Sequence, residues 1–361
     1  MSRRATRGRS LIDRMTGSLW PRLASLPLVV EAHAFERLEA DASLGHERVT
    51  THVRLRGGGH DGFGEDVSPF ADEQNTLHRD QPELSLAGEW TLASFCAHVA
   101  TLDPWSSPPP WDPMRRWRRW AFESAGLDLA LAQAGQPLHE ALGREPRPVR
   151  FVNSLGLGDP PSAETLRTRR ERHPSVRFKL DAHPAWTPEI IEEVVATDAV
   201  DTIDFKGRYG LEVADEAALL TLYDRVIVAF PAAILEDPHE GPDFDARLEP
   251  HADRVSFDAP IATSADVTTR IVNVKPCRVG NLEALLALYA YCEARGIAMY
   301  GGGMGELGVG RGQIELLAAL FHPDTPNDVA PSAFNRSDPP EGLPASPLAP
   351  DPAPAGFRRD G

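Results

Sequence analysis

Three carboxylates and one lysine end four short apolar runs in the middle of the chain. The runs cover residues 200–204, 232–236, 254–258 and 270–275, and they end in Asp204, Glu236, Asp258 and Lys275. Each run has the length and the β-branched content of a buried strand, and helix-like sequence separates one run from the next. Because parallel strands of an α/β barrel present functional groups at their carboxyl ends, the four charged side chains are predicted to converge.

Three converging carboxylates with no fixed cation among them would repel one another. A hard divalent ion removes this repulsion, and Mg²⁺ suits a site made of oxygen ligands. The sequence therefore predicts that Asp204, Glu236 and Asp258 bind Mg²⁺ and that Lys275 faces the ion. Asp237 is a rival to Glu236 as a ligand, but neighbouring residues of a strand point to opposite faces, so only one of the two can face the ion.

The order of these residues resembles the enolase superfamily, in which an Asp, a Glu and an Asp or Glu at the ends of the third, fourth and fifth barrel strands hold the metal. Residues 235–238, Leu-Glu-Asp-Pro, look like the Glu-x-Pro strand end of that family, which favours Glu236. Residues 273–281, Asn-Val-Lys-Pro-Cys-Arg-Val-Gly-Asn, are similar to the sixth-strand segment of the muconate cycloisomerase subgroup, whose lysine is catalytic. Residues 301–311 resemble the seventh-strand segment of o-succinylbenzoate synthases, N-succinylamino acid racemases and dipeptide epimerases.

The resemblance runs from about residue 28 to residue 335 and implies a two-part α/β fold. This fold is a modified TIM barrel, (β/α)7β, with an N-terminal α+β capping domain, and the alternation of strand and helix patterns also favours a barrel. We expect a basic tail over residues 1–26, the capping domain over 27–146 and the barrel over 147–322. A proline-rich segment, 323–361, is expected to return to the cap and to be disordered after about residue 349.

Residues 57–64 are rich in glycine, which predicts a tight reversal of the chain. The stretch from Gly62 to Glu65, Gly-Phe-Gly-Glu, looks like an element of the family's capping domain. We expect the turn to be a mobile loop over the barrel mouth, because glycines lower the cost of opening and closing. Gly62 is accordingly predicted to lie near the substrate.

The resemblance implies a reaction in which a base removes the proton α to a substrate carboxylate while Mg²⁺ stabilises the resulting enolate. A lysine can be that base where burial and a nearby cation depress its pKa, and Lys275 is the candidate. The alternative role for Lys275 is a structural ion pair with a ligand carboxylate. Asn153, Gly303 and Glu306 are predicted to contact the substrate, although Asn153 could equally be an ordinary strand-end residue.

The second strand departs from the pattern of the muconate cycloisomerase subgroup. Lys179-Leu-Asp181 stands where that subgroup has Lys-x-Lys, so the expected base position holds an acid, and Asp204-Phe-Lys206 replaces the usual Asp-x-Asn. Alternation by two places these four side chains on one face, so we expect a buried ion pair between Asp181 and Lys206. Lys206 or Lys179 is then the replacement base. An alternative register makes Asp181 a metal ligand on the third strand, but counting strands from residue 148 argues against it.

Two functions follow from these patterns. The first is a Mg²⁺-dependent enzyme acting on a small carboxylate substrate, either a racemase or epimerase or a β-eliminating lyase such as o-succinylbenzoate synthase. The second is a family member that has lost proton abstraction and only binds an anionic ligand. The carboxylates together with Lys275 favour the first function, and Asp181 favours the second.

The bulk properties exclude other classes. A net charge of −16 over 361 residues argues against a nucleic-acid partner, which needs a concentrated basic surface. Three scattered cysteines do not form a disulfide framework, and no stretch approaches the roughly 20 apolar residues that a membrane helix needs. Arginines near the N-terminus are not followed by a signal-peptide core. We therefore expect a cytoplasmic enzyme without a membrane partner, and whether it forms a homo-oligomer is left open.

Overall fold

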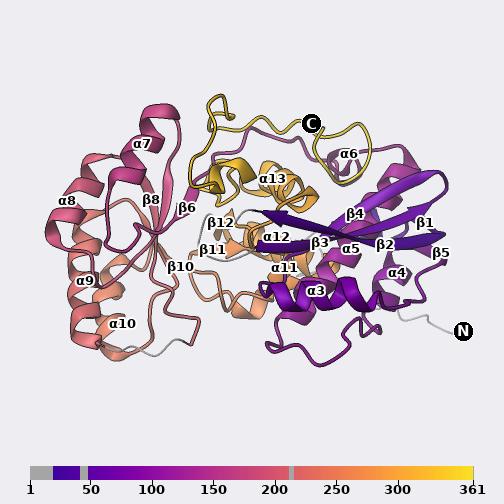
Figure 1. Cartoon of the computed structure of the whole chain (residues 1–361), viewed down its shortest axis with the longest axis horizontal. Coiled ribbons are helices and arrows are strands. Elements are labelled where there is room, and N and C mark those ends of the chain that lie inside the picture. Colours follow the sequence, from indigo (N-terminus) through magenta and orange to yellow (C-terminus); the bar gives the residue numbers. More distant parts are fainter. Residues whose placement is uncertain (1–18, 41–47, 211–214, 361) are drawn as a thin grey trace, which may run out of the picture.

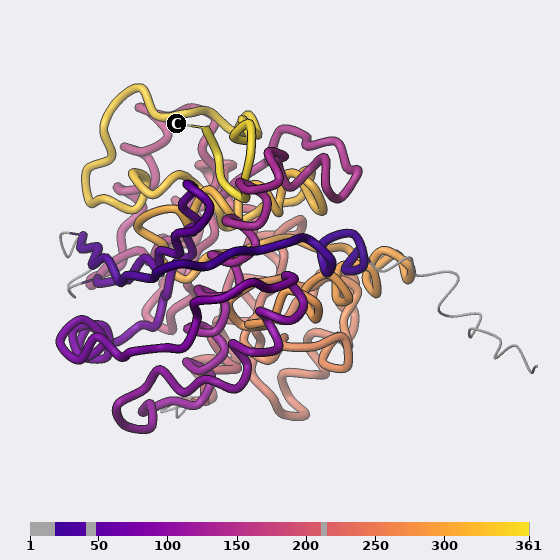
Figure 2. The backbone as a smooth tube through the Cα atoms, turned by 90° about the vertical axis from the view of Figure 1, so that its right-hand side faces the viewer, coloured from indigo at the N-terminus to yellow at the C-terminus, as the bar shows by residue number. Residues whose placement is uncertain are grey.

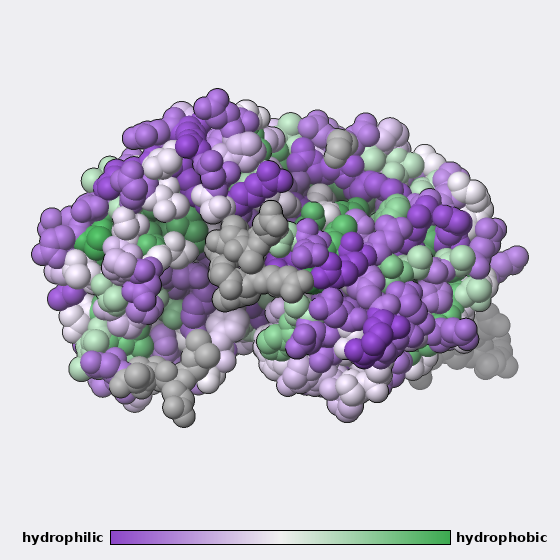
Figure 3. All heavy atoms as spheres, in the orientation of Figure 1, coloured by the Kyte–Doolittle hydropathy of each residue, from purple (hydrophilic) through white to green (hydrophobic). Residues whose placement is uncertain are grey.

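The computed structural model describes residues 19–40, 48–210 and 215–360, and it divides into a capping domain and a barrel that lie side by side (Figure 1). The predicted basic tail lies outside the described residues as far as residue 18. Polar residues dominate the face of the molecule seen in Figure 3, in keeping with the net charge of −16. Within the described ranges, no helix is long and apolar enough to cross a membrane.

Within residues 19–40 and 48–142, the structure shows two antiparallel sheets and five helices in the capping domain. One sheet has the order β2-β3-β4, and its strands are Ala32–Ala40, Arg48–Gly57 and His60–Asp66. The other sheet pairs β1 (Pro27–Val30) with β5 (Gly88–Thr91). The helices are α2 (Trp20–Ala24), α3 (Ala71–Asp80), α4 (Leu92–Val99), α5 (Met114–Ala134) and α6 (Leu138–Leu142). Helix α5 is buried along most of its length and lies against β4.

The glycine-rich stretch is a tight hairpin and not a loop over the barrel mouth, so that prediction is wrong. Gly57 pairs with His60 across the turn between β3 and β4, and the Gln133 side chain donates a hydrogen bond to the Gly57 carbonyl oxygen at 3.0 Å. Gly62 is needed for packing, because a Cβ atom there would overlap the Leu129 backbone nitrogen of α5. Gly62 thus lies against a cap helix, and its contact with the substrate stays a prediction.

The barrel is built from seven parallel strands whose order in the sheet follows the sequence, from β6 to β12. The strands are β6 (Asn153–Leu155), β7 (Phe178–Asp181), β8 (Val200–Asp204), β9 (Ile234–Glu236), β10 (Val255–Phe257), β11 (Ile271–Val274) and β12 (Ala298–Gly301). The α-helices of the barrel are α7 (Glu164–Arg172), α8 (Pro188–Ala196), α9 (Glu216–Ala229), α10 (Pro242–Leu248), α11 (Pro276–Val279), α12 (Leu282–Arg295) and α13 (Val309–Phe321). Short 3₁₀ turns are η1 (Glu249–His251), η2 (Ser264–Asp266) and η3 (Ser332–Asn335). Asp181 therefore ends the second strand, which excludes the alternative register.

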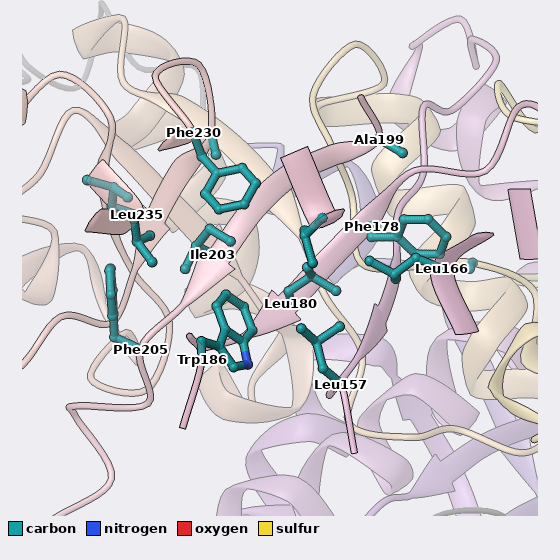
Figure 4. Packing of buried hydrophobic residues seen from close by; sticks show 14 of the residues in the cluster. Leu157, Leu166, Phe178, Leu180, Trp186, Ala199, Ile203, Phe205, Phe230 and Leu235 are labelled. Carbon is teal, nitrogen blue, oxygen red and sulfur yellow. The ribbon is translucent and has the colours of Figure 1, made fainter. Parts of the chain in front are cut away.

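Alternation along the strands separates an apolar outer face from a polar interior. Phe178, Leu180, Ile203 and Leu235 belong to the buried cluster that packs against the surrounding helices (Figure 4). Full burial of one such side chain contributes roughly 1.5–3 kcal/mol, so the apolar residues fix the register of each strand. In the same register, the residues that alternate with these apolar side chains point toward the barrel axis. Lys179, between Phe178 and Leu180, is one of them.

Residues 327–328 of the proline-rich segment, which we call the closing strand, link the two edges of the sheet through isolated β-bridges. The Val152 N–H donates to the Asn327 carbonyl oxygen at 2.7 Å, and the Asp328 N–H donates to the Gly301 carbonyl oxygen at 2.8 Å. Asn327 and Asp328 thus form parallel bridges toward both edges of the sheet. The fold class, (β/α)7β with a capping domain, is confirmed.

The chain after the closing strand crosses over α13 and ends against the cap, as the yellow trace shows in Figures 1 and 2. Phe357 is fully buried and packs edge-on against Trp120 of α5, with ring centroids 6.3 Å apart. Its N–H donates to the Asp128 carboxylate at 2.6 Å. The sequence predicts disorder after residue 349, whereas in the structure the Phe357 side chain anchors this segment to the cap.

Candidate active site

The predicted charged strand ends meet at one end of the barrel. Asp204, Glu236 and Asp258 have no exposed surface, Lys275 is 5% exposed and Lys179 is 1% exposed. We call these five residues the strand-end cluster. Asp204 and Glu236 end β8 and β9, Asp258 directly follows β10, and Lys275 directly follows β11, while Lys179 lies in β7.

Lys179 joins two of the carboxylates. Its Nζ lies 3.0 Å from Asp204 Oδ2 and makes a shorter ion pair with Glu236 Oε1. The same ammonium lies 3.9 Å from Asp328 Oδ2, on the closing strand. The Lys179 side chain therefore occupies the space between the ends of β8 and β9.

Asp258 has two cationic partners of its own. Lys275 Nζ lies 2.8 Å from Asp258 Oδ2, and Arg278 Nε lies 3.0 Å from Asp258 Oδ1. The Tyr209 hydroxyl group donates a further hydrogen bond to Asp258 at 3.3 Å. The alternative role of Lys275, an ion pair with a ligand carboxylate, is thus present in this arrangement.

These contacts correct the expectation that the carboxylates have no fixed cation among them. The protein itself places Lys179, Lys275 and Arg278 against them. Charge pairing of this kind is required for buried carboxylates, which are strongly destabilising without a partner. Mg²⁺ is therefore not the sole means of making this group of carboxylates tolerable.

The expected ion pair between Asp181 and Lys206 is confirmed, with Lys206 Nζ 3.1 Å from Asp181 Oδ1. Contrary to the prediction, the ion pair is not buried: the Asp181 and Lys206 side chains are 42% and 35% exposed, at the rim of the cluster. Lys206 Nζ also lies 2.6 Å from Asp204 Oδ2. The Lys206 backbone has a φ of 55°, a left-handed conformation that is uncommon for lysine, and its N–H donates to Asp204 Oδ1 at 2.9 Å.

The charges shift the protonation equilibria of the cluster. Burial lowers the pKa of Lys179, but Asp204 and Glu236 outweigh it and raise that pKa well above its usual value. Burial likewise lowers the pKa of Lys206, and its carboxylate neighbours again raise it. Burial raises the pKa of Glu236 to about 8, because Lys179 does not fully offset Asp204 and Asp258. Lys179 and Lys206 therefore both keep their protons at neutral pH in this arrangement.

The donor set fits a hard divalent ion in its chemistry. Its members are three buried carboxylates from successive strands, and Asp258 Oδ1 accepts no hydrogen bond, although it forms an ion pair with Arg278 Nε at 3.0 Å. The remaining oxygens of the three are engaged, for example Glu236 Oε2 by the Tyr300 hydroxyl at 2.5 Å. In the part of the chain that the structure describes, no group of three His, Cys, Asp or Glu side chains is arranged to hold a metal ion. Mg²⁺ fits the residues only if Lys179 moves.

The predicted substrate-contacting residues and Asp237 differ in the neighbours that they contact. The Asn153 side chain is bound to Arg169 Nη1 at 2.6 Å, so the structure directs it toward α7 and not into the cluster. Glu306 is buried and lies 3.2 Å from Arg311 Nη2, which gives it a structural partner. Gly303 adjoins Glu306, because a Cβ atom on Gly303 would overlap the Glu306 carboxylate. Asp237 does not face the ion position, because its carboxylate accepts the Asp258 N–H at 2.8 Å.

Sequence reasoning overlooked the partners of the carboxylates and one compositional signal. Arg278 and Asn273 lie in the sixth-strand segment, but the strand-end pattern assigns them no role, and Asp328 lies among prolines that predict a tail. The signal is the lysine count: of 37 Lys and Arg residues in the chain, only Lys179, Lys206 and Lys275 are lysine. All three belong to the strand-end cluster or contact it.

Solved structures share this fold. The chain superimposes on a mandelate racemase/muconate lactonizing protein from Herpetosiphon aurantiacus with a TM-score of 0.68 and 18% identity, covering 93% of this chain and 100% of that one. For the muconate cycloisomerase from Pseudomonas fluorescens the TM-score is 0.63, with 18% identity and coverage of 84% and 87%. The predicted enolase-superfamily fold is thereby confirmed.

Curated relatives agree with the structural class. An o-succinylbenzoate synthase of Geobacillus stearothermophilus is 30% identical over 226 residues, which are 59% of this chain and 58% of the synthase. An N-succinylamino acid racemase of Thermus thermophilus is 28% identical over 319 residues, 81% of each chain. The match thus spans less than two thirds of the synthase. These relatives bear out the predicted resemblance to the enolase superfamily.

Two family models cover most of the chain. The one described as "Domain of unknown function (DUF8230) C-terminal domain" matches residues 145–336, and the corresponding N-terminal domain matches residues 21–141. The chain therefore belongs to the DUF8230 family, which here has the fold of the enolase superfamily. The boundary between the two matches falls where the cap ends and the barrel begins.

Proposed function

We propose that the protein removes the proton α to the carboxylate of a small substrate, leading to racemisation, epimerisation or β-elimination. The observation that carries this proposal is the restriction of lysine to the strand-end cluster and its rim in a chain with 34 arginines. Arginine stays charged at all relevant pH values, whereas lysine can lose its proton and act as a base. All other basic positions with a permanent charge in this chain are arginine, and the three lysines lie at the site where a proton would be transferred.

Lys275 is the base in this proposal. It follows β11 directly, and its Nζ contacts Asp258 at 2.8 Å and Met304 Sδ at 3.8 Å. Lys179 and Lys206 each pair with at least two carboxylates, whereas among the described residues Lys275 pairs with Asp258 alone, which favours Lys275 as the base. Lys206 is proposed instead to place a positive charge near the substrate, with Asp181 orienting it from β7.

Asp204, Glu236 and Asp258 would hold Mg²⁺, and the bound ion would supply positive charge for the enolate oxygens. Members of the enolase superfamily bind a divalent metal ion, usually Mg²⁺. Both oxygens of Asp258 lie close to cations, Oδ1 to Arg278 and Oδ2 to Lys275, whereas Asp204 and Glu236 share Lys179. A cytoplasmic location stays a prediction, as does the question of a homo-oligomer.

Proton exchange tests the role of Lys275. The α-proton of an N-succinylamino acid should exchange with D₂O in the presence of the wild-type protein and MgCl₂, as followed by proton NMR. Exchange should be lost in Lys275→Ala and equally in Lys275→Arg. The arginine variant is the matched control, because it keeps the positive charge beside Asp258 but cannot act as a base. Exchange at the wild-type rate in Lys275→Arg would show that another group is the base.

A second function is favoured by the ion pairs of Lys179 and Lys206. Both cations are engaged by carboxylates, and Asp181 stands where the related subgroup has a basic residue. A protein of this kind would bind an anionic carboxylate without reacting. Binding of the N-succinylamino acid in calorimetry, with no exchange under the same conditions, would favour this function over catalysis.

A further inference from the structure

We infer that Lys179 is a built-in counter-ion of the metal site, which holds Asp204 and Glu236 when no metal is bound and has to leave them when Mg²⁺ enters. This inference rests on the proposed metal site. It assigns to Lys179 a role in metal affinity and not in the chemical step. Lys179 is thus a positioning residue for two ligands.

The geometry singles out Lys179 among the cations of the cluster. It contacts carboxylates at the ends of two different strands, Asp204 on β8 and Glu236 on β9. Lys275 and Arg278 both pair with Asp258 alone, and Lys206 pairs with Asp204 and with the rim residue Asp181. Lys179 is therefore the cation that lies between candidate ligands.

The three carboxylates depend on Lys179 to different degrees. Asp258 keeps a cation if either Lys275 or Arg278 is lost, and Asp204 retains Lys206 if Lys179 is lost. Among the described residues, Lys179 makes the one ion pair of Glu236. Because Glu236 has no exposed surface, loss of Lys179 would leave it as a buried carboxyl group without an ion-pair partner.

The lysine and the metal ion must compete, because both need the same oxygens. Lys179 Nζ touches Glu236 Oε1 and Asp204 Oδ2, so a cation placed between these two carboxylates competes with the ammonium for them. The flexible four-carbon stem of lysine allows the ammonium to withdraw without movement of β7. Metal affinity is consequently reduced by the free energy needed to break these two ion pairs.

The variant Lys179→Met separates this role from a purely structural one. Methionine keeps the apolar stem and removes the charge. In calorimetric titration with MgCl₂, the variant should bind Mg²⁺ about tenfold more tightly than the wild type, or better, because no ion pair has to be broken. In thermal unfolding with EDTA the variant should melt below the wild type, whereas the rise in Tm caused by MgCl₂ should be larger for the variant. Loss of a structural residue alone would lower metal binding as well as stability.

Lys206→Met is the matched control. It removes the same charge near Asp204 but leaves Lys179 in place between the ligands. Its gain in Mg²⁺ affinity should be clearly smaller than that of Lys179→Met. Equal gains in both variants would mean that general charge removal explains the effect, and equal affinity of Lys179→Met and wild type would overturn the inference directly. Absence of Mg²⁺ binding in every protein would instead refute the metal site of the proposed function and the inference with it.

A measurement on the wild-type protein decides the matter if Lys179→Met fails to fold. Reductive methylation with formaldehyde modifies amines, and in this chain only three lysines and the terminal amine can react. MgCl₂ should speed the methylation of Lys179 several-fold, as read by peptide mass spectrometry, because the ion releases its ammonium from two carboxylates. A methylation rate at Lys179 that saturating MgCl₂ leaves unchanged would overturn the inference.

Discussion

Replacing Glu65 with glutamine should weaken the attachment of the capping domain to the barrel. Glu65 lies at the inner end of β4 and is only 1% exposed. Its Oε1 accepts hydrogen bonds from Thr50 Oγ1 at 2.7 Å and from the Leu307 N–H at 2.6 Å, and its Oε2 accepts the N–H groups of Gly308 at 3.0 Å and Gly310 at 2.9 Å. The three N–H groups lie at the start of α13, where backbone donors have no partner within the helix.

The size of the expected loss in unfolding free energy follows from the hydrogen bonds that glutamine is unable to accept. Glutamine keeps one oxygen and presents an NH₂ group in place of the other, so two of the four hydrogen bonds cannot form. A hydrogen bond to a charged group contributes about 1.5–3 kcal/mol, and we therefore expect the free energy of unfolding to fall by about 3–6 kcal/mol. Urea unfolding followed by tryptophan fluorescence measures this decrease, because Trp117 and Trp120 are buried in α5 of the cap.

Thr50→Val is the control for this prediction. It removes only the hydroxyl group that donates to Glu65 and leaves the carboxylate on the α13 donors, so it should cost about 1 kcal/mol. A decrease below about 1 kcal/mol in Glu65→Gln, or decreases of the same size in both variants, would refute the view that the carboxylate joins the two domains.

The remaining predictions concern the rim, the acid limb of stability and the chain end. A double-mutant cycle of Asp181→Asn and Lys206→Met, measured by urea unfolding, should give a coupling energy of about 0.2–1 kcal/mol, because the two side chains are 42% and 35% exposed. A coupling energy near zero would mean that the ion pair is not formed in solution. Burial lowers the pKa of His322 from 6.5 to about 4. Between these pH values the imidazole is protonated in the unfolded state but not in the folded state. The free energy of unfolding should therefore fall by about 3 kcal/mol as the pH drops from 6.5 to 4. His322→Gln, which retains a donor for Asn327, should flatten this limb in pH-dependent unfolding, and an unchanged slope would contradict the assignment. Phe357→Ala should lower the free energy of unfolding by about 3–5 kcal/mol, whereas a change within about 0.5 kcal/mol would show that the chain end does not dock.

The pattern of strands and the convergence of their charged ends could be predicted from the sequence. Apolar runs that end in Asp204, Glu236 and Lys275 specify both the strands and the edge of the sheet at which these residues meet. The choice of Glu236 over Asp237 also followed from alternation, since the structure turns Glu236 toward Lys179 and Asp237 toward the next loop.

The pairing of the charges could not be predicted in the same way. Lys179 reaches past β8 to Glu236 on β9, and a reach of that kind depends on side-chain length and barrel curvature, which no local pattern encodes. Asp328 lies in a single-residue bridge among prolines, too short for a periodic signal. Glycine-rich sequence is ambiguous, because Gly62 serves close packing against α5 whereas the same composition also suits a flexible loop.

The closing strand at residues 327–328 has a consequence for how the protein forms during synthesis. The cap and the strands β6 to β12 leave the ribosome before this segment, so the sheet has an open gap between β6 and β12 until the segment is made. Domains generally fold from the N-terminus during translation, and unpaired strand edges favour wrong pairing between nascent chains. The barrel can therefore be completed, and Asp328 placed near Lys179, only after the seven strands have been synthesised. Phe357 then packs against Trp120 and holds the following segment on the cap.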